Sequence, residues 1–406
     1  MRILLLTQVL PFPPDSGPKV KTWNLIKYLA SNHEVILASF VRGDQTDSIR
    51  QLEKYCREVH TVPIERGVFR DLMYLVQSFL TSQPFLMVRD RRKEMEDMVD
   101  QLTSRLDFDI VHADQLNMAQ YAIRVPVARK VLDAHNALWL LYKRLWQTMK
   151  TGPKKWLLNR DWRILKKYEG QICRKFDSVL AVSEEDHQAM NEAAGKQLDV
   201  TIIPIAIDIE EVVPLEYRPA GDRILHIGTM FWPPNIDGIL WFLKEILPLI
   251  QEKRPEVVFD IIGANPPKEI VAFGNAGHKV NVTGYVQDPT PYLENASLMV
   301  VPLRAGGGMR VKILNALGQG MPVVSTTLGC EGIAVKDGVH LLVADTAQDF
   351  ASSVIRLLED RHLAKDLGKR GRQLIEDNYD YRIACRALEE AYAAALATTT
   401  KERLAK

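Results

Sequence analysis

The sequence is poor in cysteine and has no excess of one charge. Its four cysteines lie far apart and form no C-x-x-C pair, which argues against a disulfide framework or a zinc site and favours a reducing, cytoplasmic compartment. The 52 basic residues are balanced by 51 acidic residues. The net charge of +1 argues against a dedicated nucleic-acid binder.

The sequence also lacks long hydrophobic runs. No stretch of about 20 apolar residues is present, so a transmembrane helix is not expected. A signal peptide is not expected either, because Met1 leads into strand-like RILLLTQVL without an A-x-A site. The nearest candidate, 72–88, contains several polar residues, and we interpret it as a core-facing helix ended by Pro84.

The most informative segment is 300–324, VVPLRAGGGMRVKILNALGQGMPVV. The pattern predicts a buried strand, a loop with glycines at 306–308, and an amphipathic helix that opens near Met309. Bare N–H groups at a helix N-terminus favour anions, and Arg310 and Lys312 add two cations. The segment contains no P-loop motif. It therefore predicts a diphosphate site, although an ordinary glycine turn remains the alternative.

The rest of the chain alternates strand-like and helical segments, which predicts parallel sheets covered on both faces. A length of 406 residues allows two domains. The segment 204–222 contains three prolines and becomes polar, so we place the domain joint there. We expect an N-terminal domain at 1–210, a second domain at 211–380, and a C-terminal helix at 381–406 that packs back toward the N-terminal domain.

Motifs along nearly the whole chain resemble the retaining GT-B glycosyltransferases of the group 1, or family 4, type. They include DSG at 15–17, DAHN at 133–136, FDSVLAVSEED, PIAID, LHIGTMFWPPNIDGILWFL, DIIGANPP, VTGYVQD, the glycine loop with its helix, and VVSTTLGCEGI. The resemblance implies α/β GT-B architecture, in which two Rossmann-like doubly wound domains face each other across a cleft. It also implies sugar transfer from a nucleotide diphosphate, with retention, without a metal and without a cofactor.

The resemblance also assigns roles to individual positions. Arg310 and Lys312 match positions that face the donor diphosphate, and His135 matches one that contacts the donor sugar, so these three are the catalytic candidates. The donor-binding candidates are Gly17, Gly228, Thr229, Gly284, Tyr285, Val286, Gly307, Gly308, Met309 and Asn315. Asp15 and Asp114 are acceptor-side candidates, and Asp15 has a turn or helix-cap role as its alternative.

Two departures from the family pattern bear on activity. Many members carry Glu-x7-Glu through the glycine loop, where this chain has Gly307 and Asn315. An asparagine accepts ribose hydrogen bonds without the assistance of a charge, which predicts weaker donor binding. The arginine and lysine that often follow the first strand of the second domain are missing at 228–230, so Arg310 and Lys312 carry the diphosphate charge alone.

The segment 138–176 is basic and aromatic. Eleven Lys and Arg residues are opposed only by Asp161 and Glu169, and four tryptophans are interleaved with them. One interpretation is a face that docks on an anionic membrane surface, which makes the protein a cytoplasmic enzyme peripheral to the inner face of the membrane. The other is a solvated helical face whose tryptophans belong to the core.

These observations favour a hexosyltransferase-type glycosyltransferase of polysaccharide biosynthesis with a glycan or lipid-linked acceptor. Nucleic acid is not an expected partner, because no reader motif accompanies the basic segment. One alternative retains the fold and makes the protein a sugar-nucleotide epimerase. Another, motivated by Asn315, makes it a sugar-nucleotide-binding protein without catalysis.

Overall fold

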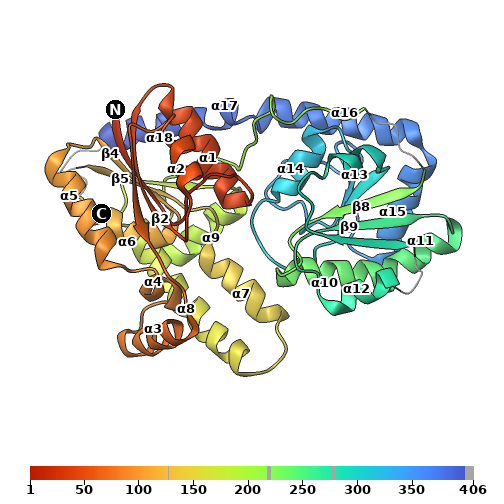
Figure 1. The fold of residues 1–406 in the computed structure, drawn as a ribbon, viewed down its shortest axis with the longest axis horizontal. Helices are drawn as coiled ribbons and strands as arrows, with labels where there is room; N and C mark the ends of the chain where they lie inside the picture. Colours follow the sequence, from red (N-terminus) through yellow and green to blue (C-terminus); the bar gives the residue numbers. More distant parts are fainter. Residues whose placement is uncertain (127, 217–220, 276–278, 398–406) are drawn as a thin grey trace. The chain divides into compact units, whose positions relative to one another are not determined.

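The structure is a computed structural model that describes residues 1–126, 128–216, 221–275 and 279–397. The chain forms two compact units. Unit 1 consists of 1–206 with the segment from Tyr381 onward, and unit 2 of Ile207–Asp380. Figure 1 shows each unit as a sheet covered by helices. Among the described residues, no helix is both long and apolar enough to cross a membrane.

Unit 1 is built on a parallel seven-stranded sheet of order β3-β2-β1-β4-β5-β6-β7 within the described residues. The strands are β1 (Arg2–Thr7), β2 (Glu34–Val41), β3 (Glu58–Pro63), β4 (Ile110–Asp114), β5 (Arg129–Asp133), β6 (Ser178–Ala181) and β7 (Val200–Ile202). The order 3-2-1-4-5-6 is that of the Rossmann fold, so the sequence expectation of a doubly wound sheet is confirmed.

The helices of unit 1 cover both faces of this sheet. They are α1 (Gly17–Ala30), α2 (Thr46–Leu52), α3 (Val68–Thr81), α4 (Phe85–Arg89), α5 (Lys93–Arg105), α6 (Ala119–Ala122), α7 (Leu138–Thr148), α8 (Pro153–Cys173) and α9 (Glu184–Ala194), with a 3₁₀ turn at Leu116–Met118. Alternate residues of β1 serve opposite faces: Leu4 and Leu6 join one core, Ile3 and Leu5 the other. This double burial explains why the strand reads as a continuous apolar run.

The last helices of the described residues belong to unit 1. After unit 2, the chain forms α17 (Tyr381–Ala384) and α18 (Arg386–Ala397), drawn in blue in Figure 1. Leu388 and Tyr392 of α18 are fully buried in the same core as Ile3 and Leu5. Unit 1 is therefore completed by a segment that the chain delivers only after it has formed unit 2.

Unit 2 has a parallel six-stranded sheet of order β10-β9-β8-β11-β12-β13 among its described residues. Its strands are β8 (Arg223–Ile227), β9 (Val258–Ile262), β10 (Val280–Gly284), β11 (Leu298–Val301), β12 (Val323–Ser325) and β13 (Leu342–Val343). Its helices are α10 (Pro233–Trp241), a π segment η2 (Phe242–Ile246), α11 (Leu247–Lys253), α12 (Lys268–Asn275), α13 (Thr290–Asn295), α14 (Val311–Gly318), α15 (Ala347–Glu359) and α16 (Arg361–Asn378). This is a second sheet of Rossmann type.

The interpretation of 72–88 as a core-facing helix is wrong. The segment contributes to two helices, α3 and α4, with Ser82 in the left-handed conformation between them. Only Ser78 of α3 is buried, and its apolar stripe faces outward. The segment is helical as far as Thr81, but a helical period does not tell which side of a helix meets the protein.

Candidate functional site

The order of the strands identifies one place in each sheet where ligands bind in such folds. In unit 2 the order reverses between β8 and β11, and a crevice outside the carboxyl ends of the strands forms at such a point. The loop that begins at Gly228 follows β8, and the glycine loop follows β11. The topology thus brings together two segments about 80 residues apart, both predicted to bind the donor.

The glycine loop connects β11 to α14, which begins at Val311 with Arg310 as its N-cap. Gly306 and Gly308 have φ of 109° and 79°, a conformation that side chains disfavour. The Arg310 guanidinium donates to the carbonyl oxygens of Gly307 and Gly308, so it lies over its own loop. Met309 beside it is buried.

Lys312 reaches from the first turn of α14 to the end of β8. A Cβ added to Gly228 would lie 2.6 Å from the Lys312 Nζ, so only glycine leaves room for this amine. The Nζ is 3.4 Å from the Asn235 Oδ1, and the Asn235 amide donates to the Thr229 carbonyl at 2.8 Å. Burial, together with the nearby Arg310 charge, lowers the pKa of Lys312 to about 7.

A buried histidine lies near this amine, and both side chains approach the Gly228 position. His226 of β8 is fully buried, and its Nδ1 bonds the Val300 carbonyl of β11 at 2.9 Å. Burial and the Lys312 charge hold the pKa of His226 well below its usual value, so the ring is neutral with the proton on Nδ1. Its Nε2, which has no hydrogen-bond partner among the described residues, would lie 3.1 Å from a Cβ at Gly228.

The remaining candidates of unit 2 lie after β8, at the end of β10 and within α14. Gly284 ends β10 with φ of 75°, and its carbonyl accepts from the Gly263 amide at 2.9 Å. Tyr285 beside it is 76% exposed, and Val286 is half-buried. Thr229 and Asn315 are exposed, so both side chains are open to a ligand.

A second polar cluster lies at the reversal point of unit 1, between β1 and β4. His135 follows β5, and its Nε2 is 2.8 Å from the Asp114 Oδ1 at the end of β4. Thr22 of α1 donates to the same oxygen at 2.9 Å. The carboxylate orients the ring, and the His135 Nδ1 is buried with no hydrogen-bond partner among the described residues. With the Nε2 proton directed at Asp114, this Nδ1 is a buried acceptor without a donor among the described residues.

Asp133 is the buried charge at the centre of this cluster. Burial alone would raise its pKa, but the ammonium of Lys21 and the neighbouring histidines outweigh burial and hold the pKa of Asp133 well below its usual value. His112 lies 3.7 Å from Asp133 and bonds the Tyr392 hydroxyl of α18 at 2.7 Å. The C-terminal helix therefore supports the cluster directly.

Three residues of this cluster carry atoms that can ligate a metal ion. Ligand atoms of Asp114, Asp133 and His135 lie within 4.8 Å of one another, a spacing compatible with a bound ion. However, Lys21 already pairs with Asp133, and Thr22 and His135 both hydrogen-bond the Oδ1 of Asp114. These partners make the set a poor fit for a metal ion.

Unlike the residues of this buried cluster, Asp15 is exposed and Gly17 is half-buried. Gly17 is the first residue of α1, and Asp15 is exposed and pairs with Lys19 at 3.0 Å, one turn away. Sequence reasoning missed Lys21 and Thr22, since the period of α1 carries no sign that these two residues meet the ends of β4 and β5. It also missed His226 and Asn235, whose role depends on β8 lying beside β11.

Two family models match the chain. The model for "Glycosyltransferase Family 4" matches residues 16–211, and that for "Glycosyl transferases group 1" matches residues 221–360. A protein of Klebsiella pneumoniae described as an uncharacterised 44.6 kDa protein in the cps region is 21% identical over 93% of this chain and 96% of its own length.

Solved structures share the fold. Sucrose-phosphate synthase from Thermosynechococcus elongatus has a TM-score of 0.71 at 16% identity, covering 98% of this chain and all of that one. Anabaena HepE, solved with UDP and glucose, has a TM-score of 0.69 at 14% identity, covering 97% of this chain and all of that one. The two family matches divide between unit 1 and unit 2, and with these folds they identify the chain as a glycosyltransferase of GT-B architecture.

Proposed function

We propose that the protein transfers a sugar from a nucleotide diphosphate donor to a glycan or lipid-linked acceptor, with retention at the anomeric carbon and without a metal. The observation that carries this proposal is the Lys312 amine at Gly228, beside the glycine loop of the reversal point in unit 2. Lys312 is half-buried, and burial disfavours its charge, so the cation has a reason to be retained where an anion binds.

The donor diphosphate gains negative charge as the bond to the sugar breaks. Lys312 and the N–H groups at the start of α14 stabilise this charge more in the transition state than in the ground state. Arg310 contributes after its guanidinium leaves the Gly307 and Gly308 carbonyls. The helix dipole of α14 acts in the same direction.

His135 positions the sugar through its Nδ1, which accepts a hydrogen bond from a sugar hydroxyl while Asp114 holds the ring. For retention we favour substitution on the front face. The bond from the acceptor oxygen to the anomeric carbon forms on the side from which the diphosphate leaves, and the acceptor proton passes to the leaving phosphate oxygen. No protein nucleophile is needed for this step.

The support for a sugar nucleotide comes also from the relatives. Anabaena HepE was solved with UDP and glucose, and the Klebsiella relative is described by its place in a cps region. On this chain the base would lie near Gly284–Val286 and the ribose near Asn315. The basic segment 138–176 is proposed to bring the enzyme to an anionic membrane surface, where a lipid-linked acceptor is available.

The experiment begins with thermal unfolding in the presence of individual nucleotide sugars, since a ligand at about 100 times its Kd adds about 2.7 kcal/mol of stability. The donor so found is incubated with candidate acceptors, and the anomeric configuration of the product is read by NMR. Activity that persists after extensive chelation supports a reaction without a metal. An inverted product would refute retention.

The alternatives predict different products. An epimerase converts the donor sugar without an acceptor, and a binding protein is stabilised by the donor without any turnover. Asn315 in place of the usual glutamate is the observation that favours the second alternative. Asn315→Glu should strengthen donor binding; unchanged or weaker binding would remove Asn315 from the ribose site.

A further inference from the structure

Helix α3 of unit 1 carries an apolar stripe that the described residues leave open. Its spacing follows the helical period, so the side chains gather on one side of the helix. The exposed fractions are 90% for Val68, 76% for Phe69, 58% for Leu72, 59% for Met73, 53% for Val76, 39% for Phe79 and 82% for Leu80. Exposed apolar surface of this extent marks an interaction site.

Polar contacts fix α3 with this stripe outward. Ser78 is its buried residue, and Arg160 of α8 donates to the Ser78 carbonyl at 2.7 Å and to its hydroxyl at 3.1 Å. The Arg160 guanidinium also lies 4.0 Å from the centre of the Phe79 ring. The inward side of α3 is thus satisfied by hydrogen bonds, and Phe79 at the edge of the stripe makes a cation–π contact with Arg160. The described residues of unit 1 leave the rest of the stripe exposed.

The apolar surface continues from α3 onto α8. Trp156 is 61% exposed and stacks on Phe79, with ring centres 5.9 Å apart and planes 11° from parallel. By contrast, Trp139 is buried in the core, and Trp146 and Trp162 are half-buried. Of the four tryptophans in 138–176, therefore, only Trp156 has the exposure that membrane docking requires.

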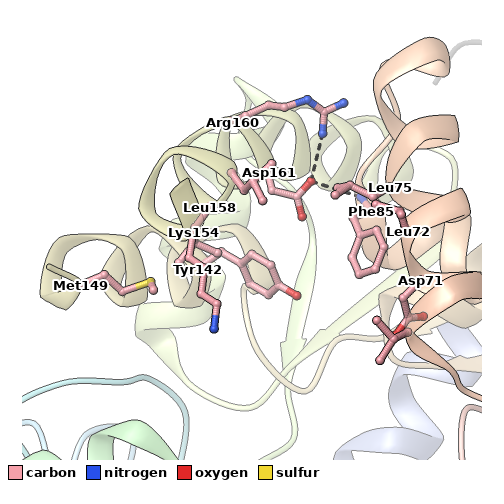
Figure 2. Close-up of a pocket in the computed structure, with 12 residues that line it drawn as sticks. Asp71, Leu72, Leu75, Phe85, Tyr142, Met149, Lys154, Leu158, Arg160 and Asp161 are labelled. Carbon is pink, nitrogen blue, oxygen red and sulfur yellow. Dashed lines mark hydrogen bonds and ion pairs between the residues drawn. The ribbon is translucent and has the colours of Figure 1, made fainter. Parts of the chain in front are cut away.

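A cavity of about 490 Å³ opens beside the stripe, between α3, α4, α7 and α8. Its apolar wall includes Leu72 and Leu75 of α3, Phe85 of α4 and Leu158 of α8. Figure 2 shows Tyr142 among these side chains, with Asp161 bonded to Arg160 and to the Phe85 backbone. Burial raises the pKa of Tyr142 to about 12, so its hydroxyl stays neutral. The lining also includes the charged side chains of Asp71, Lys154, Arg160 and Asp161, but most of the wall is apolar. A mostly apolar space of this size suits a hydrocarbon chain.

The exposed charge of the basic segment beside this surface is cationic, although α3 itself carries Asp71. The two acids of the basic segment, Asp161 and Glu169, are buried and accept backbone amides, so neither offsets the basic residues at the surface. The exposed cations of the segment are Lys150, Lys154, Arg163, Lys167 and Lys175. An apolar stripe whose neighbouring helix, α8, carries exposed cations is complementary to a bilayer whose headgroups are anionic.

We propose that the α3 stripe, Trp156 and the α3–α8 cavity form one lipid-binding surface, which lies on an anionic bilayer and takes a lipid hydrocarbon chain into the cavity. This inference rests on the proposed function, because it makes the acceptor a lipid-borne one. Helix α7 supports the link: it begins three residues after His135, and its Tyr142 lines the cavity.

The test is flotation of the full chain with vesicles. Wild-type protein should float with phosphatidylcholine vesicles that contain phosphatidylglycerol and much less with pure phosphatidylcholine. The double variant Leu72→Glu/Val76→Glu should lose about tenfold or more in the bound fraction, because it places two carboxylates in the stripe. The matched control is Val213→Glu in unit 2, also an exposed valine, which should float like wild type. Absence of wild-type flotation, or equal flotation of the double variant, would overturn the proposal.

The cavity is tested separately. Protein recovered from the anionic vesicles in mild detergent should carry one phospholipid by native mass spectrometry, and Leu158→Trp, which fills the cavity, should carry none. Wild-type protein without lipid would refute the cavity as a chain site. Stabilisation by nucleotide sugars does not involve this surface. If nucleotide sugars stabilise the protein but the protein does not float, the lipid inference fails alone. If the protein floats but no nucleotide sugar stabilises it, the proposed function fails.

Discussion

The charged form of Lys312 lowers the stability of the folded protein, while the proposed function needs that charge to bind the donor diphosphate. The Lys312 pKa of about 7 means that the folded state holds the ammonium less readily than the unfolded chain does. The cost is present in full below pH 7 and is relieved as pH rises toward the ordinary lysine value. A residue retained for stability alone would not show this behaviour.

We therefore predict that Lys312→Met stabilises the ligand-free protein at pH 6 by about 1–2 kcal/mol, less than the whole shift implies because the residue is only half-buried. The gain should shrink at pH 9, and stabilisation by the donor should be lost. Thermal unfolding at both pH values, with and without donor, measures all three effects. A variant less stable than wild type at pH 6 would mean that the amine supports the fold.

The same pKa predicts how donor binding depends on pH. Above pH 7 the free enzyme must take up a proton on Lys312 when the diphosphate binds, so affinity should fall by up to about tenfold per pH unit. Calorimetry in two buffers of different ionisation enthalpy reports this proton uptake. Lys312→Arg is the control, because arginine remains charged and should bind without the pH dependence.

At the scale of elements, the sheets were the most predictable part of the molecule. A parallel strand buried on both faces must be apolar throughout, so β1 is recognisable from its sequence alone. The pairing of Lys21 with Asp133 was not predictable, since 112 residues separate them and only the strand order brings them together. The outward stripe of α3 was missed for a related reason: its period is the same whichever side faces the protein.

The Lys312 amine of α14 can lie at the end of β8 because Gly228 has no side chain. In Gly228→Ala the new methyl group would meet the flexible end of Lys312 before any backbone atom, so the chain should fold while the amine is displaced. We expect thermal stability near that of wild type and at least a tenfold loss of donor affinity, equivalent to about 1.4 kcal/mol. Gly152→Ala is the control, because a Cβ there meets nothing within 4 Å. Unchanged donor affinity in Gly228→Ala would contradict the placement of the diphosphate.

At the scale of the whole molecule, the path of the chain makes unit 1 depend on the last segment of the chain. The face of the unit 1 sheet that carries Ile3 and Leu5 is covered in part by α18, which follows unit 2 in the chain. Tyr392 of the same helix bonds His112, which lies beside Asp133 in the polar cluster. Loss of contacts in α18 should therefore disturb both the core and the candidate site of unit 1.

We predict that Leu388→Ala destabilises unit 1 by about 2–5 kcal/mol, the usual cost of removing a fully buried leucine side chain. Hydrogen–deuterium exchange read by mass spectrometry should show faster exchange in β1 and β5, and unchanged exchange in β8 and β11. Glu390→Ala, on the exposed side of α18, should leave both patterns unaltered because surface substitutions cost little. Faster exchange in β8 and β11 after Leu388→Ala would show that the two units do not fold as separate bodies, because the substituted side chain packs only in the core of unit 1.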